Sequence, residues 1–184
     1  MTSSSPASPH RRRVLAGLAG GIVAVAAAPN AIAALPERRI AIHHLHTGER
    51  LDLTYKRGSR YLPDALARLD YHLRDWRQNS TRHIDPKLYD ILTEIAARLD
   101  HDPVFEIICG YRSPRTNTML RKRSSGVARR SLHLAGRAID FRIRGAELAR
   151  VRDASMKLAA GGVGYYPSSD FIHVDTGHVR HWQG

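Results

Sequence analysis

Residues that can bind a metal recur in two short segments whose other side chains are largely apolar. Polar and apolar residues alternate along 138–144, which places Asp140 on the strand face opposite the apolar side chains. His173 takes the equivalent position in 171–175, and His133 precedes Asp140 by seven residues across a loop. If the two strands lie side by side, the three side chains converge. Two imidazoles and one carboxylate suit Zn²⁺ and leave a position open for water, so the pattern predicts one catalytic zinc ion per chain.

Simpler interpretations of the same residues stay open at this point. Each histidine could be a hydrogen-bonded surface residue, and Asp140 could pair with an arginine in this basic chain. His and Asp at loose spacing are a weak motif by themselves. A second histidine group, His43, His44 and His46, lies near the N-terminus, and we interpret it as a turn of solvated side chains.

Four ordered motifs resemble those of the M15-type zinc peptidases, which include D-Ala-D-Ala carboxypeptidases and murein endopeptidases. Residues 131–140, SLHLAGRAID, resemble the SxHxxGxAxD motif of that family. Residues 171–177, FIHVDTG, with the later Trp182, resemble the last motif of one branch, FxHxDxG followed by a tryptophan. CGYRS at 109–113 and GGVGYY at 161–166 resemble two further segments of that branch. The resemblance covers about residues 45–182 and is nearest to the murein endopeptidase K branch (YcbK-like, DUF882).

The resemblance implies a role for each motif residue. It makes His133, Asp140 and His173 the zinc ligands. It makes Asp175 the base or water-orienting carboxylate, and Arg112 the partner of the scissile carbonyl or of a substrate carboxylate.

Two of these assignments have a rival within the resemblance. Many M15 peptidases place the acidic catalytic residue three before the last histidine, where Asp170 stands. We favour Asp175, because it shares a strand face with His173 whereas Asp170 ends a Ser-rich turn. His178 resembles the metal-binding histidine of some carboxypeptidases of the group, but Gly177 places it off the strand, and we favour His173.

The activity that the resemblance implies is hydrolysis of peptide cross-links in peptidoglycan, including those that join two diaminopimelate residues. A D,D-carboxypeptidase that trims D-Ala from stem peptides is an alternative with the same chemistry. A non-catalytic, zinc-stabilised wall-binding module is the alternative of a different class, against which Asp175 and Arg112 argue.

The elements that must position these residues indicate an α+β fold. Alternating residues predict a hairpin over 38–55 and strands over 104–108, 138–144, 163–166 and 171–175. Apolar stripes predict helices over 62–76, 85–99 and 145–159, and Ser113-Pro114 opens a shorter one. Helices and strands do not alternate regularly, which argues against a doubly wound sheet. The resemblance implies one domain with a small, mostly antiparallel sheet and flanking helices, the zinc D-Ala-D-Ala-peptidase-like (hedgehog-like) fold.

Residues 1–33 have the composition of an export signal. Arg11, Arg12 and Arg13 precede an uncharged apolar run that is too short to span a membrane, and Ala31-Ile32-Ala33 offers a small-x-small cleavage site. The pair Arg11-Arg12 resembles the twin-arginine signal. We therefore expect a periplasmic peptidase domain over 34–184, exported by the twin-arginine route and without a stable membrane span after processing.

Charge and cysteine content narrow the partners further. The formal net charge is +12, of which three positive charges belong to residues 1–33. Basic chains often bind nucleic acid, but an exported protein meets wall polymers instead, so no nucleic-acid partner is expected. Cys109 is the single cysteine, which excludes an intramolecular disulfide, and its apolar neighbours favour a buried structural thiol.

Overall fold

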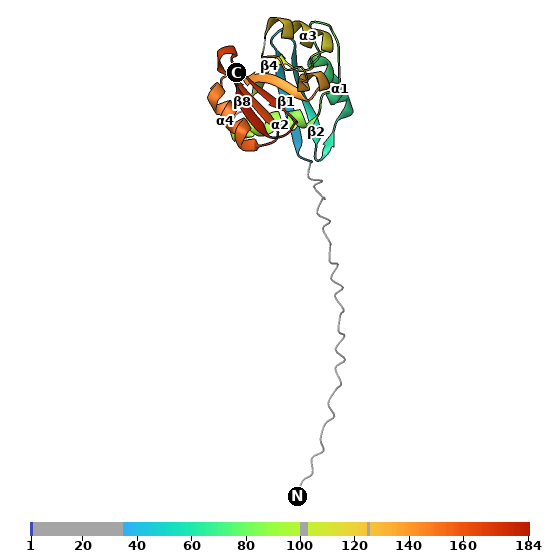
Figure 1. Ribbon diagram of the computed structural model, residues 1–184. Coiled ribbons are helices and arrows are strands. Elements are labelled where there is room, and N and C mark those ends of the chain that lie inside the picture. Colours follow the sequence, from blue (N-terminus) through green and yellow to red (C-terminus); the bar gives the residue numbers. More distant parts are fainter. Residues whose placement is uncertain (2–34, 100–102, 125) are drawn as a thin grey trace. The chain divides into compact units, whose positions relative to one another are not determined.

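The computed structural model describes Met1 and residues 35–99, 103–124 and 126–184 (Figure 1). Apart from Met1, the predicted export signal lies outside the described residues. Residues from Ala34 to Gly184 form one compact unit, which contains every helix and strand named below. No helix among the described residues is both long and apolar enough to cross a membrane.

An eight-stranded sheet is the centre of this unit. Its strands are β1 (Glu37–His44), β2 (Arg50–Arg57), β3 (Arg60–Tyr61), β4 (Val104–Cys109), β5 (Ala138–Ile143), β6 (Gly162–Tyr166), β7 (Phe171–Asp175) and β8 (Arg180–Gln183). Their order across the sheet is β3-β2-β1-β4-β5-β7-β6-β8. β1 pairs parallel with β4, and β6 pairs parallel with β8, while the other neighbours are antiparallel. The α+β class is confirmed, but the expected small sheet is wrong, because the sheet has eight strands and is mixed, with two parallel pairings among mostly antiparallel ones.

The sheet exceeds the prediction because two of its strands are too short to show a pattern. β3 has 2 residues and β8 has 4, and such runs scarcely display a period-two alternation. The two parallel pairings could not be predicted either, because they join strands that are not consecutive in the sequence. β4 arrives beside β1 only after the chain has passed through α1 (Pro63–His72) and α2 (Lys87–Arg98).

Three helices cover the apolar face of the sheet. They are α1, α2 and α4 (Leu148–Leu158), and α2 and α4 contact each other (Figure 1). One hydrophobic core joins Leu92 and Ile95 of α2 to Ile42, Phe105 and Phe141 of the sheet. Burial of these apolar side chains holds the two layers together. The remaining helix is α3 (Pro114–Arg123), and the short 3₁₀ helices η1 (Leu132–Ala135) and η2 (Pro167–Ser169) precede β5 and β7.

All three long helices are shorter than predicted, and for α1 and α4 the neighbouring contacts give the reason. α1 ends before Leu73, whose carbonyl oxygen accepts a hydrogen bond of 2.8 Å from the N–H of Tyr111. This bond draws the chain out of the helix towards the segment after β4. α4 starts at Leu148 because Gly145 adopts φ +79°, a left-handed conformation that favours glycine and ends the preceding turn.

The histidine group near the N-terminus is only partly solvated, since His46 is exposed and His43 half-buried but His44 is buried. His44 is 1% exposed, because it continues the inward alternation of Ile40 and Ile42 along β1. The His44 and His72 rings lie 6.2 Å apart, and His72 is buried too. Burial, with a further contribution from His72, lowers the pKa of His44 to about 4.

Candidate metal centre

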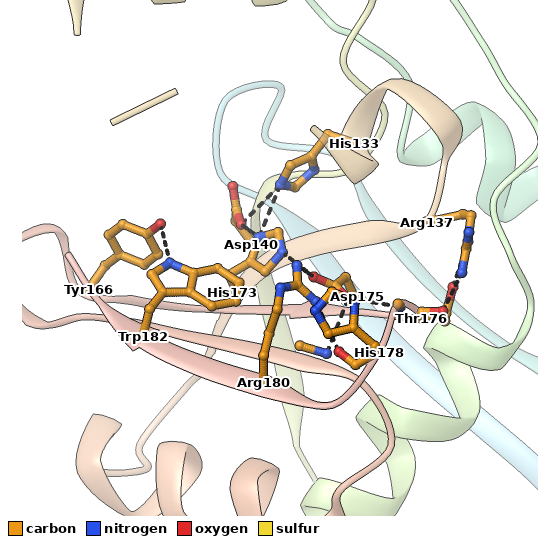
Figure 2. A network of polar contacts seen from close by, with 12 residues as sticks. His133, Arg137, Asp140, Tyr166, His173, Asp175, Thr176, His178, Arg180 and Trp182 are labelled. Atoms are coloured by element: carbon orange, nitrogen blue, oxygen red, sulfur yellow. Dashed lines mark hydrogen bonds and ion pairs between the residues drawn. The ribbon is translucent and has the colours of Figure 1, made fainter. Parts of the chain in front are cut away.

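Three side chains converge on one point on the polar face of the sheet (Figure 2). Asp140 of β5 stands directly opposite His173 of β7, and η1 brings His133 beside them. Oδ1 of Asp140 lies 3.1 Å from Nε2 of His133 and 2.7 Å from Nδ1 of His173. The two nitrogens are 3.2 Å apart. The structure therefore brings together the three residues predicted as ligands, and all three are buried.

This donor set fits a zinc ion. Zinc binds imidazole nitrogen at about 2.0–2.1 Å and carboxylate oxygen at about 2.0–2.2 Å, so tetrahedral ligand atoms stand roughly 3.3 Å apart. The observed separations of 2.7 to 3.2 Å approach that value. Two imidazoles and one carboxylate also leave the fourth position open, as in catalytic zinc sites.

Each of the two histidines has its second nitrogen bound to an acceptor. Nδ1 of His133 lies 2.7 Å from the carbonyl oxygen of Gly110, and Nε2 of His173 lies 3.1 Å from Oδ2 of Asp175. When a metal ion occupies the site, these acceptors hold the ring proton on Nδ1 of His133 and on Nε2 of His173. The other nitrogen of each ring then presents its lone pair to the metal position.

Opposite charges compensate for the burial of the donor set. Burial raises the pKa of Asp140, but His133 and His173 lower it by more, so the carboxylate stays ionised. Burial lowers the pKa of His133, whereas Asp140 and Cys109 raise it to about 10. A proton and a metal ion therefore compete for Nε2 of His133, and acid weakens metal binding.

Asp175 contacts the side of His173 that faces away from the donor set. Its Oδ1 accepts hydrogen bonds from the N–H groups of Gly162 at 3.1 Å and Gly177 at 2.8 Å. Arg180 contacts Oδ1 at 3.0 Å and Oδ2 at 2.6 Å. The side chain is 0% exposed, and its pKa is lowered because the hydrogen bonds and charges outweigh burial. These contacts favour a role other than the base predicted from sequence.

The two rival residues lie away from the three donor atoms. Asp170 is exposed before β7 and forms an ion pair with Arg142. His178 is exposed in the turn between β7 and β8, where its carbonyl oxygen accepts a hydrogen bond from Arg180. The structure thus places His173, and not His178, beside His133 and Asp140.

Arg112 and Cys109 flank the donor set. Nη2 of Arg112 lies 3.7 Å from Oδ2 of Asp140 and 3.6 Å from Sγ of Cys109. Cys109 is the cross-strand neighbour of Asp140, and its sulfur lies within 4.8 Å of donor atoms of His133 and Asp140. Cys109 is half-buried, less than the buried thiol predicted, and lies beside the candidate metal centre; its structural role stays a prediction.

A pocket of about 610 Å³ gives access to the donor set. Arg112, Arg130 and Arg180 contribute positive charge to its lining, and Tyr166 and Trp182 form part of one wall. Nε1 of Trp182 donates a 2.9 Å hydrogen bond to the Tyr166 hydroxyl, which fixes the two rings relative to each other. A pocket of this charge attracts substrates that carry carboxylates.

The sequence analysis did not predict the contact of Arg180 with the site, nor that two glycines leave space for neighbouring side chains. Arg180 belongs to no motif, and its strand was not predicted. A Cβ on Gly162 would lie 2.5 Å from Oδ2 of Asp175, and a Cβ on Gly164 would lie 2.7 Å from the Trp182 ring. The GGVG run was visible in the sequence, but its neighbours become known only from the pairing of β6 with β7 and β8.

Known proteins are similar in sequence to this chain over most of its length. Residues 32–182 match the family described as peptidoglycan L,D-endopeptidase MepK. The chain is 42% identical over 176 residues to the peptidoglycan L,D-endopeptidase MepK of Escherichia coli (strain K12), which covers 94% of this chain and 97% of that protein. It is 42% identical over 183 residues to the probable peptidoglycan L,D-endopeptidase MepK of Haemophilus influenzae, with 95% and 97% coverage. No solved structure gives a significant match. The chain therefore belongs to the M15-type peptidase family of MepK endopeptidases.

Proposed function

We propose that this protein is an exported zinc metallopeptidase that hydrolyses peptide cross-links in peptidoglycan. The observation that carries the proposal is the convergence of His133, Asp140 and His173 beside a cationic pocket. The relatives named as peptidoglycan L,D-endopeptidases support the substrate class. An enzyme of this class acts in the periplasm, which agrees with the export signal expected from residues 1–33.

The three converging donors would hold one zinc ion per chain. Bound zinc supplies a Lewis acid for the scissile carbonyl and lowers the pKa of a bound water towards 7. The Gly110 carbonyl and the Asp175 carboxylate bind the outer ring nitrogens, and so turn Nε2 of His133 and Nδ1 of His173 towards the metal position. It also leaves the remaining position open to the pocket, where a substrate carbonyl can enter.

Arg112 is the residue placed to stabilise negative charge on the scissile carbonyl oxygen. Its guanidinium lies beside the donor set and is largely buried, with a side-chain exposure of 12%. Its Nε makes no hydrogen bond within the described part of the chain. A fixed cation shielded from water stabilises the charge of a tetrahedral intermediate more strongly than an exposed one does.

We assign the general base to neither Asp175 nor Asp170. The Asp175 oxygens are occupied by Arg180, two backbone N–H groups and His173. Asp170 is tied to Arg142 outside the donor set.

We propose that the preferred bond joins two diaminopimelate residues. Such a link connects an L-centre to a D-centre, which agrees with the L,D specificity in the names of the relatives. Its flanking groups carry free carboxylates, and Arg130 adds a positive charge to the pocket lining that can attract them.

Digestion of purified sacculi, with metal analysis of the same preparation, tests the proposal. The protein should hold one zinc ion and release monomeric muropeptides from cross-linked material, as read by chromatography. A chelator should abolish the release and added zinc should restore it. His173→Ala should lose zinc and activity, whereas His178→Ala should keep both. Release of terminal D-Ala alone would show a D,D-carboxypeptidase, and zinc binding without any product would show a wall-binding module; either result would contradict the proposal.

A further inference from the structure

We infer that Asp175 and Arg180 form a positioning pair that fixes the tautomer and orientation of His173 and thereby sets the zinc affinity. The inference rests on the proposed zinc site and gives Asp175 a function exerted through the ligand, not on the water. Figure 2 shows Asp175 between His173 and Arg180.

The two nitrogens of His173 have different partners. Nδ1 lies 2.7 Å from Oδ1 of Asp140, at the metal position, while Nε2 lies 3.1 Å from Oδ2 of Asp175. Both partners are carboxylates, which only accept hydrogen bonds. When a metal ion takes the lone pair of Nδ1, Nε2 therefore carries the ring proton and donates a hydrogen bond to Asp175. The same contact places the Asp175 carboxylate on the far side of the ring from the donor set. A carboxylate in this place orients a ligand instead of taking a proton from the metal's water.

Arg180 holds the Asp175 carboxylate in that place. Nη1 and Nη2 bind Oδ1 at 3.0 Å and Oδ2 at 2.6 Å, a two-point contact that fixes both the position and the plane of the carboxylate. The N–H groups of Gly162 and Gly177 complete the set of donors. A carboxylate that is 0% exposed needs such compensation to stay ionised.

The backbone around the pair has room for it only because glycine stands at two positions. A Cβ on Gly162 would lie 2.5 Å from Oδ2 of Asp175 and closer still to the Arg180 guanidinium. A Cβ on Gly161 would collide with the backbone carbonyl of Asp175. Gly162 is also the register partner of Arg180 in the parallel pairing of β6 with β8. The short strand β8 therefore places Arg180 where the missing side chain of Gly162 leaves space for it.

The zinc dissociation constant of Asp175→Asn, measured in the full chain by competition with a chromogenic chelator, tests the inference. All partners of the Asp175 oxygens are donors, so the NH₂ group of an asparagine must face one of them and displace it. We expect the dissociation constant to rise about 10- to 100-fold. Hydrolysis of sacculi should then recover towards the wild-type rate as the zinc concentration is raised. If Asp175 is the base instead, the variant will bind zinc like the wild type and stay about 10²- to 10⁴-fold slower at every zinc concentration, which overturns the inference.

Two arginine variants serve as the second test and its control. Arg180→Gln should raise the zinc dissociation constant in the same direction, and Arg180→Lys, which keeps the charge but not the two-point contact, should raise it less. Arg142→Gln removes an arginine from another arginine–aspartate pair and should leave zinc binding unchanged.

Folding of each variant is checked by circular dichroism without zinc. If Asp175→Asn does not fold, the zinc dissociation constant of Arg180→Gln tests the inference instead. The Arg180 side chain is 34% exposed, so its replacement disrupts the fold less. Unchanged zinc binding in a folded Arg180→Gln protein overturns the inference. A wild-type protein that binds no zinc contradicts the proposed function as well, so the two failures are distinguishable.

Discussion

The two histidines of the donor set are held by different kinds of acceptor. The ring of His133 is fixed by the backbone carbonyl of Gly110, which no substitution can remove. The ring of His173 is fixed by a side chain, Asp175, which depends in turn on Arg180. Mutation of Asp175 or Arg180 can therefore adjust zinc affinity through His173 without replacing a ligand, whereas no side chain offers the same access to His133.

Asp170→Asn separates the two carboxylates that the sequence offers as a base. Asp170 is exposed, and its ion pair with Arg142 is of a kind that contributes about 0–1 kcal/mol. We expect the variant to keep its zinc and to release muropeptides within roughly threefold of the wild-type rate. Zinc analysis and sacculus digestion measure both. A loss of 100-fold or more with zinc retained would show that Asp170 turns into the pocket and acts as the base.

The motif residues were predictable at this scale, but the contacts of Asp175 were not. Alternation along β7 puts His173 and Asp175 on one face, and that pattern alone does not say which of them faces the pocket opening. The answer depends on Arg180 and on the N–H of Gly162, which reach Asp175 through the pairing of β6 with β7 and β8. Which strands would lie beside β6 could not be read from the sequence of any one of them.

Among the elements, the register between β5 and β7 decides whether a site exists. Asp140 stands opposite His173, and Ile139 stands opposite Val174 on the core face. A slip by one residue would place an apolar side chain opposite Asp140 and a polar one in the core. The same apolar residues that made the strands predictable thus also fix the register that assembles the donor set.

Ser113→Ala tests how far the start of α3 supports the neighbouring Arg112. Oγ of Ser113 accepts a 3.2 Å hydrogen bond from the N–H of Thr116, and the Ser113 N–H donates to Oδ2 of Asp75 at 2.9 Å. Loss of this cap should lower the free energy of unfolding by about 0.5–2 kcal/mol, as measured with urea. Since Arg112 directly precedes the cap, the rate of muropeptide release should fall as well.

Thr118→Ala is the matched control for the cap. Its hydroxyl donates to the Pro114 carbonyl on the exposed side of the same helix. We expect a change within about 0.5 kcal/mol and normal activity. Equal losses of stability in both variants would show that the cap has no special function.

At the scale of the whole molecule, buried His44 makes the fold sensitive to acid. Burial and His72 lower the pKa of His44 to about 4, with smaller lowering contributions from His46 and Arg74 and an opposing one from Glu49. The folded state thus favours the neutral ring. The stability that follows is fully present above the ordinary pKa of about 6.5 and is lost as the pH falls through 6.5 towards 4.

Thermal unfolding of the zinc-free protein between pH 8 and pH 4.5 measures this loss. His44→Gln removes the titrating ring, so its midpoint temperature should fall less steeply below pH 6.5 than that of the wild type. The difference between the two slopes isolates His44 from the other groups that titrate in this range. Parallel slopes would show that His44 does not carry the acid sensitivity.

The site also bears on how the molecule leaves the cytoplasm. His133 and His173 are 40 residues apart and meet only when β5 and β7 have paired, so the donor set exists only in a folded chain. The pair Arg11-Arg12 resembles the signal of the twin-arginine route, which carries folded proteins and would permit zinc to be inserted before export.

Replacing Arg11 and Arg12 with lysine should then trap the precursor in the cytoplasm, whereas Arg13→Lys, the matched control, should leave export normal. Cell fractionation locates the protein, and N-terminal sequencing of the exported form should find Ala34 first. Normal export of the double-lysine variant would instead indicate the general secretory route, with zinc bound after export.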